Sequence, residues 1–342
     1  MAEHLTGRER IRRIFAGEAA DRVGFWMGQP HKNSWPALLA AFGTDDPEAV
    51  RAALGDDYRW VCHQGSCYHH PDGLPIFINP RATDDLSAPG VFADCEDPAE
   101  VLAHTRPDPA CLDFSDWIED LRRSGDRYRA SGMWCPFFHQ AADYFGMENY
   151  FVKMYTDPEV VHAVTKHLVD FYLAANEKLF TEAAGEIDGF VFGNDFGSQL
   201  DMLIGPAQFA EFVAPYFKQL TDQAHAHGRQ VILHSCGSIH RIIPDLIAMG
   251  VEALHPLQAR AANMDAETLA RDFPGQVAFV GGIDTQHLLP RGTADEVRAE
   301  VRRVRDVLGP RLVVSPSHET LLPDVPVENV KAMAEAARET DD

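Results

Sequence analysis

The feature that most constrains the fold of this chain is a regular alternation of short apolar runs and longer helical patterns after about residue 130. Each apolar run is followed by polar residues and then by a segment with helical spacing. Most of the runs lack an alternation of apolar and polar residues, which is typical of strands that are covered on both faces. The sequence therefore predicts buried strands over 189–193, 230–234, 253–255, 277–281 and 312–315.

The segments between these strands carry recognisable helix boundaries. Pro206 opens a predicted helix that runs to about His225 and is followed by Gly228. A second predicted helix begins at 293–296 and ends before Gly309. In the less regular first part of the chain we expect a helix near 7–16, a strand near 22–27 and helices within 34–54. A stretch over 62–90 is rich in Pro, Gly and His, and we interpret it as a loop inserted at the active site.

Strands that alternate with helices form either a closed barrel or an open, doubly wound sheet. The chain has no G-x-G-x-x-G turn, a motif common in doubly wound nucleotide-binding folds, and its absence favours the barrel. We therefore predict an α/β fold, a (β/α)8 TIM barrel with an N-terminal helical extension and loop insertions, that occupies residues 1–342 as a single domain. Polar residues that end the strands should then surround the active site.

Charge and composition exclude several classes of partner. The formal net charge of −22 would repel nucleic-acid phosphates and an anionic membrane surface. The chain has no apolar run of roughly 18 residues, which a membrane span requires, and its N-terminal residues do not resemble a signal peptide. Six scattered cysteines do not indicate a disulfide framework. We expect a soluble cytoplasmic protein that acts on a small molecule, and a homo-oligomer is compatible with the sequence.

A histidine and a cysteine stand two positions apart at the end of the predicted strand 230–234. Side chains alternate between the faces of a strand, so His234 and Cys236 should project in the same direction and can share one metal ion. Imidazole nitrogen and thiolate sulfur both suit zinc. We also expect a helix to begin at Gly237, so that its positive N-terminal end favours the thiolate. The alternative is a buried histidine beside an inert core cysteine.

A catalytic zinc usually has three protein ligands and one open position. Our candidate for the third ligand is His318, which follows the last predicted strand and should lie at the mouth of the barrel. Asp195 follows the strand 189–193 and is a candidate base, acid or ligand, with a turn or helix cap as the alternative.

Other polar residues near predicted strand ends are candidates for binding the substrate. Each of them is equally compatible with a role in a loop, a helix cap or a hydrogen-bonded core; Asp284 in particular is expected to cap the following helix if it does not bind substrate. These candidates are Gln29, His31, His139, Asn194, Gln199, Asp284 and Gln286.

The chain resembles the uroporphyrinogen decarboxylase superfamily, which also contains zinc-dependent methyltransferases that move methyl groups between corrinoid proteins and thiols. The resemblance covers most of the chain and implies a (β/α)8 barrel whose site lies at the C-terminal ends of the strands. It is carried by the order and spacing of the segments 194–199, 212–216, 234–238, 281–286 and 323–330.

Two departures from the family pattern bear on the reaction. The haem-pathway decarboxylases resemble one another in two N-terminal arginines that hold substrate carboxylates, and Gly28 and Lys32 stand at the corresponding positions here. The methyltransferase branch normally supplies a second cysteine near the last strand, but this chain has no cysteine after Cys236. The resemblance then implies a site of His234, Cys236 and His318, with Asp195 or Glu319 as an additional oxygen ligand or as a catalytic group.

These observations predict a zinc-dependent methyltransferase or demethylase that acts on a small molecule, with a corrinoid protein as the possible methyl donor or acceptor. One alternative is a decarboxylase or another lyase that acts on a carboxylated substrate. The other is a barrel that binds a metal without catalysis.

Overall fold

Eight parallel strands form the centre of the molecule in a computed structural model that describes residues 4–78, 83 and 85–339. Their order is β1-β9-β8-β7-β6-β5-β4-β3. The two outer strands are joined where the Asp57 amide donates to the Phe25 carbonyl at 2.9 Å, so the sheet closes into a barrel. The strands are β1 (Gly24–Phe25), β3 (Tyr58–Trp60), β4 (Tyr128–Ser131), β5 (Gly189–Gly193), β6 (Gln230–His234), β7 (Ala253–Leu257), β8 (Ala278–Ile283) and β9 (Leu312–Pro316).

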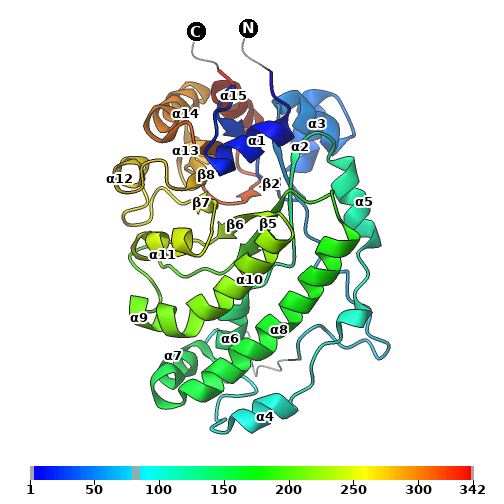
Figure 1. The fold of residues 1–342 in the computed structure, drawn as a ribbon. Helices are drawn as coiled ribbons and strands as arrows, with labels where there is room; N and C mark the ends of the chain where they lie inside the picture. The colour runs from blue at the N-terminus through cyan, green and yellow to red at the C-terminus, as the bar shows by residue number, and fades with distance from the viewer. Residues whose placement is uncertain (1–3, 79–82, 84, 340–342) are drawn as a thin grey trace.

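Helices surround the barrel and connect its strands (Figure 1). A second, two-stranded sheet pairs β2 (Gln29–Pro30) with β10 (Thr320–Leu321). The helices are α1 (Gly7–Ala16), α2 (Trp35–Phe42), α3 (Pro47–Leu54), α4 (Pro98–Ala103), α5 (Ser115–Arg123), α6 (Phe137–Phe145), α7 (Met147–Thr156), α8 (Pro158–Glu182), α9 (Pro206–Gln208), α10 (Ala214–Ala226), α11 (Ile243–Ala248), α12 (Ala266–Asp272), α13 (Leu288–Arg291), α14 (Ala294–Leu308) and α15 (Val327–Ala337).

The predicted (β/α)8 barrel is therefore confirmed, and local signals in the sequence explain most element boundaries. The helix expected near 7–16 begins after Thr6, whose hydroxyl accepts a hydrogen bond from the Glu9 amide. The helix expected after 293 begins with a reciprocal capping box between Thr293 and Glu296. The stretch 62–90 forms neither helix nor strand in the part that the structure describes; residues 79–82 and 84 lie outside that part.

One of the expected helix starts is wrong. Residues 237–239 after Cys236 are irregular, and the first helical turn begins only at His240. Gly237 has φ +81°, a left-handed conformation that is incompatible with the first turn of a helix. The thiol of Cys236 therefore does not lie at the N-terminus of a helix.

The N-terminal end of the barrel is closed by α1. Ile11, Ile14 and Phe15 pack into the barrel interior together with inward-facing residues of the strands. Arg311, just before β9, donates hydrogen bonds to the carbonyl oxygens of Ile14 and Phe15 and so fixes the end of this helix. In Figure 1, α1 lies at the same end as α14, α15 and both chain termini. The opposite end, where the strands finish, is left for a site.

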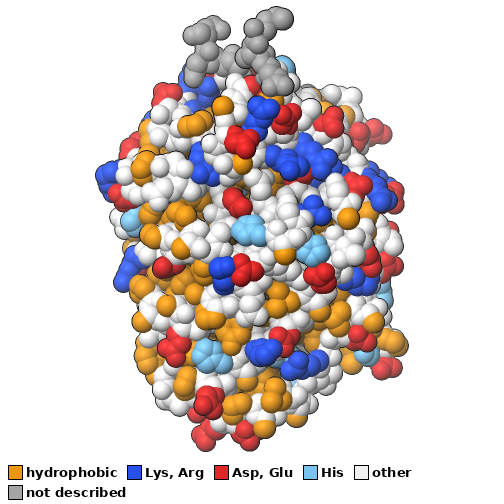
Figure 2. Space-filling model, in the orientation of Figure 1, with side chains coloured by type: hydrophobic (Ala, Val, Ile, Leu, Met, Phe, Trp, Pro, Cys, Tyr) orange, Lys and Arg blue, Asp and Glu red, His pale blue; other side chains and the backbone are white. Residues whose placement is uncertain are grey.

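Charged side chains of both signs lie on the molecular surface. Basic and acidic side chains are both present over the face that Figure 2 shows. Among the helices that the structure describes, none has the length and apolar character that crossing a bilayer requires.

Candidate metal centre

Strand alternation brings the candidate side chains to one place at the C-terminal end of the barrel. Ile232 and Ala253 belong to the barrel interior. Two residues further along the same strands, His234 and His255 face the same interior. His234 pairs with His255 on one side and with Gly193, the last residue of β5, on the other. The ends of three adjacent strands therefore lie at one level.

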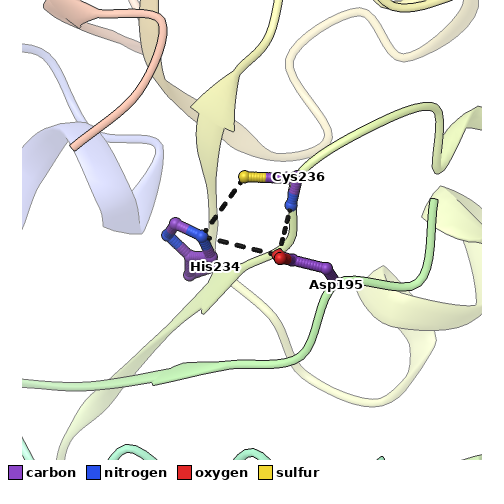
Figure 3. Close-up of side chains that lie close together, drawn as sticks. All are labelled: Asp195, His234 and Cys236. Atoms are coloured by element: carbon purple, nitrogen blue, oxygen red, sulfur yellow. Dashed lines mark hydrogen bonds and ion pairs between the residues drawn. The ribbon is translucent and has the colours of Figure 1, made fainter. Parts of the chain in front are cut away.

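Asp195, His234 and Cys236 form a compact group above these strand ends (Figure 3). The Nε2 atom of His234 lies 3.5 Å from Cys236 Sγ and 3.5 Å from Asp195 Oδ1. The Asp195 carboxylate is held in place because its Oδ1 accepts a hydrogen bond of 2.8 Å from the Cys236 amide. Within the described residues, this is the single group of three or more His, Cys, Asp or Glu side chains whose ligand atoms lie within 4.8 Å of one another.

These distances can be compared with those of a zinc site. With zinc–nitrogen and zinc–oxygen bonds of about 2.0–2.1 Å and a zinc–sulfur bond of about 2.3 Å, neighbouring ligand atoms in a tetrahedron are about 3.3–3.6 Å apart. The separations of His234 Nε2 from Cys236 Sγ and from Asp195 Oδ1 are both 3.5 Å. Three protein donors of nitrogen, sulfur and oxygen type also leave the fourth position for a substrate. The residues present therefore fit a zinc ion.

The pKa values of Cys236 and His234 are both shifted in this group. Burial raises the pKa of the Cys236 thiol, and the nearby Asp195 and Glu319 carboxylates raise it further. Burial lowers the pKa of His234 despite the same two carboxylates. Without a cation, the thiol stays protonated and the imidazole stays neutral at neutral pH. A bound dication would reverse this preference at Cys236 and stabilise the thiolate.

His255 was not among the residues proposed from sequence, although it ends a predicted strand. Its side chain is 3% exposed, and its Nδ1 lies 2.9 Å from Nδ1 of His234. Only one of these two nitrogens can carry the shared proton. When His234 directs Nε2 to a metal, its Nδ1 carries the proton and donates to His255. His255 is therefore placed to accept the Nδ1 proton of His234 if Nε2 faces a metal. The position of His255 two residues beyond inward-facing Ala253 could have revealed it.

His318 lies outside the compact group. Its side chain is exposed, and its Nδ1 accepts a hydrogen bond from the Thr320 amide. The adjacent Glu319 lies closer, with Oε2 3.9 Å from His234 Nδ1 and 3.3 Å from His318 Nε2. The residue that the structure brings against His234 and Cys236 is therefore Asp195.

The other candidate residues divide into those with structural roles and those near the site. Asn194 is buried and joins two segments, since its side chain accepts from the Phe138 amide and donates to the Cys135 carbonyl. Asp284 caps the turn before α13, as the alternative expectation held, by accepting hydrogen bonds from the Gln286 and Leu288 amides.

Five further candidates remain. Gln29 donates to the Trp60 carbonyl, and His31 Nδ1 accepts from the Asn33 amide. Gln199 and Gln286 are exposed, and Gln286 lines a separate surface pocket with His318 and Asp284. The remaining candidate, His139, lies close enough to Asp195 to interact with its charge, while burial lowers its pKa.

Two tryptophans beside the metal group could not be distinguished from core residues in the sequence. The Trp134 ring packs edge-on against His234 with a centroid separation of 5.0 Å. Trp60 stacks obliquely on Trp134 at 5.0 Å. Gly193 makes this arrangement possible, because a Cβ there would lie 2.0 Å from the Trp134 ring. The glycine that ends β5 therefore positions an aromatic wall beside the metal group.

Comparison with known proteins agrees with this architecture. One similar solved structure is a methyltransferase from Methanosarcina mazei, with a TM-score of 0.67, 18% sequence identity, and coverage of 97% of this chain and 98% of that chain. At this identity the likeness establishes the shared fold. A search of curated proteins by sequence gave no match. Residues 131–340, which hold Asp195, His234, Cys236 and Glu319, match the family described as uroporphyrinogen decarboxylase (URO-D). The chain therefore belongs to the uroporphyrinogen decarboxylase family.

Proposed function

We propose that this protein is a zinc-dependent methyltransferase that moves a methyl group between a small molecule and a thiol or a corrinoid protein. The observation that carries the proposal is the group of Asp195, His234 and Cys236, whose spacing matches a tetrahedral zinc site with one free position. The zinc would supply Lewis acidity: it would bind the accepting group at that position and lower its pKa.

The residues around the metal group have distinct tasks in this proposal. Asp195, His234 and Cys236 hold the metal, and His255 keeps the proton of His234 on Nδ1. Glu319 is suited to receive the proton of the incoming thiol or hydroxyl, because its carboxylate lies 3.9 Å from His234 and its side chain lines the adjacent cavity. Trp60 and Trp134 form an aromatic wall beside His234.

The transfer itself is a nucleophilic displacement. When the acceptor is a thiol, its sulfur, deprotonated through Glu319, forms a bond to the methyl carbon with its own electron pair. The bond between that carbon and the donor breaks, and the donor keeps the pair. No external oxidant or reductant is needed when a methylated corrinoid gives its methyl group to a thiol.

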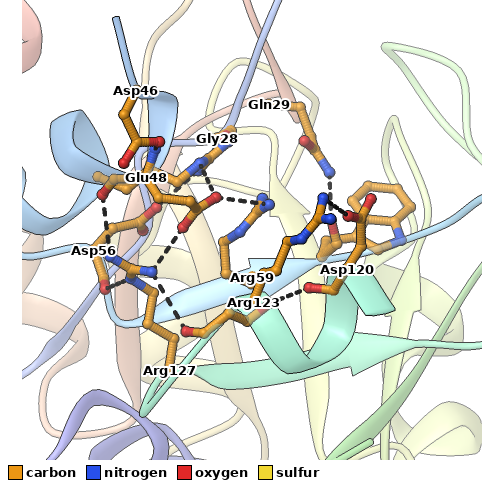
Figure 4. Close-up of polar contacts among 12 residues, drawn as sticks. Gly28, Gln29, Asp46, Glu48, Asp56, Arg59, Asp120, Arg123 and Arg127 are labelled. Carbon is orange, nitrogen blue, oxygen red and sulfur yellow. Dashed lines mark hydrogen bonds and ion pairs between the residues drawn. The ribbon is translucent and has the colours of Figure 1, made fainter. Parts of the chain in front are cut away.

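Decarboxylation of a polycarboxylate is disfavoured because the arginines near the start of the chain are not available to bind the substrate carboxylates. The position of Gly28 carries no side chain, and the neighbouring arginines already form ion pairs with carboxylates of the protein (Figure 4). Arg59 and Arg127 lie 3.0 and 2.8 Å from the two carboxylate oxygens of Glu48. Arg51 lies 2.8 Å from Asp56. These cations hold the barrel wall together and are not free to hold substrate carboxylates.

Metal analysis of the purified protein and of three variants tests the proposal. We expect one equivalent of zinc in the wild type and its loss in His234→Ala, Cys236→Ala and Asp195→Ala, with His318→Ala as the comparison that retains it. Transfer from methylcobalamin to a thiol, followed by the absorbance of the demethylated corrinoid, should require the zinc. A folded protein without bound metal would overturn the proposal. Zinc without any methyl transfer would favour a metal-binding barrel, and CO2 release from a carboxylated tetrapyrrole would favour the decarboxylase.

A further inference from the structure

A cavity of about 740 Å³ opens directly beside the metal group. It lies between the irregular segment that follows β3, the segment that follows β4, and Glu319. Trp134 lines the cavity and also packs against His234, so the cavity and the metal group share a wall. A cavity of this size accommodates a small aromatic or aliphatic molecule.

The lining of this cavity carries negative charge and no compensating positive charge. Glu319 is its one acidic residue, and no Lys or Arg lines it among the residues that the structure describes. The Glu319 Oε2 atom is buried and accepts no hydrogen bond, although His318 Nε2 lies within 3.3 Å. A buried carboxylate oxygen in this state is stabilised by any cation that enters the cavity. A carboxylate ligand would be repelled.

Aromatic rings make up much of the remaining wall. Trp60, Tyr68, Phe77 and Trp134 line the cavity. Packing from behind fixes these rings in place; Phe77, for example, contacts Phe171 with a centroid separation of 5.3 Å. The face of an aromatic ring is negative, and it attracts cations that have little hydration to lose.

We propose that the cavity binds a substrate bearing a methylated ammonium group, such as a quaternary amine. Methylation distributes the charge over an apolar surface that can contact the rings, while Glu319 neutralises the charge. A primary ammonium group would demand several hydrogen-bond acceptors. The lining offers one carboxylate, and the side-chain oxygens of Gln64 and Gln140 already accept hydrogen bonds from the Trp134 amide and the Tyr172 hydroxyl. This assignment rests on the proposed function, in which the substrate supplies or receives a methyl group, and names its chemical class.

The decisive comparison uses two probes of the same shape that differ in charge. Calorimetric titration of the protein as purified with 3-hydroxyphenyltrimethylammonium and with 3-tert-butylphenol isolates the contribution of the positive nitrogen. We expect the ammonium compound to bind about tenfold more tightly, or better, the range of a desolvated cation–π contact. The anion 3-hydroxybenzoate should bind more weakly than either. Equal binding of the two isosteres would overturn the proposal in favour of a neutral aromatic substrate, and so would absence of binding by the ammonium compound.

Variants connect the preference to this cavity. Glu319→Gln preserves the shape of the side chain and should lower affinity for the ammonium compound while leaving that for 3-tert-butylphenol within twofold. Tyr68→Leu removes a ring that does not contact the metal group and should reduce the preference as well. An unchanged preference in both variants would place the binding elsewhere and refute the assignment. The titration does not depend on zinc or turnover, so loss of the methyltransferase proposal would leave a charge preference intact and visible.

Discussion

His255 offers a prediction in which metal affinity and fold stability respond differently to one substitution. His255→Leu removes the partner of His234 Nδ1, at 2.9 Å, and leaves the ligand atoms untouched. Outer hydrogen-bond partners of metal ligands typically contribute a factor of about 10–100 to metal affinity, or about 1.4–2.7 kcal/mol. Glu319 Oε2, 3.9 Å from the same nitrogen, is too distant to replace the lost hydrogen bond.

The stability of the zinc-free protein should not fall with that affinity. His255 Nε2 is buried and has no hydrogen-bond partner. Burying a polar atom in this way costs about 1–3 kcal/mol, which an apolar leucine recovers, while the buried His234 Nδ1 that loses its partner costs a similar amount. We therefore expect the two terms to offset each other, and the free energy of unfolding of zinc-free His255→Leu to stay close to that of the wild type.

A matched control lies elsewhere in the chain. His167 is also 3% exposed, and neither of its ring nitrogens has a hydrogen-bond partner. It packs against Tyr144 and His104 rather than against the metal group. His167→Leu should likewise not lower the free energy of unfolding, and it should leave zinc affinity unaltered. Competition with a chromophoric chelator measures the affinity, and urea unfolding measures the stability. Zinc affinity of His255→Leu within threefold of the wild type would refute the tautomer argument.

Three further predictions follow from the same site. The pKa of Cys236 is raised and that of His234 is lowered, so zinc binding between pH 6 and 8 should release about one proton. The logarithm of zinc affinity should therefore rise by about one per pH unit. A slope of two would mean that His234 starts out protonated, and Cys236→Ser should abolish the pH dependence of zinc affinity. Gly193→Ala should displace Trp134 and cost about 1–3 kcal/mol of stability. Gly65→Ala is the control, because an added Cβ there meets no atom within 4 Å. An unshifted tryptophan emission in Gly193→Ala would show that Trp134 does not pack against Gly193. Chelation of zinc should lower the melting temperature, because a bound ligand stabilises the folded state. The far-ultraviolet circular dichroism should stay unchanged, because His234 and Cys236 do not belong to the two hydrophobic cores. Loss of the helical signal on chelation would show that the metal is needed for folding.

The fold and the positions of the three metal-group residues were predictable, because both depend on local periodicity and on the order of the strands. The run 230–234 identified a buried strand, and its alternation placed His234 and Cys236 on one face. Asp195 was expected at the end of the neighbouring strand, which is where parallel pairing brings it beside His234.

The remaining features depend on contacts that no local pattern encodes. His318 was proposed as a ligand from its distance beyond the last strand, but the direction of its ring is set within its own loop, by the Thr320 amide. Trp60 and Trp134 have the composition of core residues, and only the space left by Gly193 shows that they form a wall of the site. The role of His255 depends on pairing between β6 and β7, at a separation of 21 residues.

X-ray absorption at the zinc edge of the purified protein tests the central claim most directly. We expect one sulfur ligand at about 2.3 Å, from Cys236, and two or three nitrogen or oxygen ligands at about 2.0–2.1 Å. The sulfur contribution should disappear in Cys236→Ser, and the number of nitrogen or oxygen ligands should change in Asp195→Ala but not in His318→Ala. A spectrum without sulfur, with two sulfur atoms from the protein, or with a ligand lost in His318→Ala and none in Asp195→Ala would contradict the assignment of Asp195, His234 and Cys236 as the metal centre.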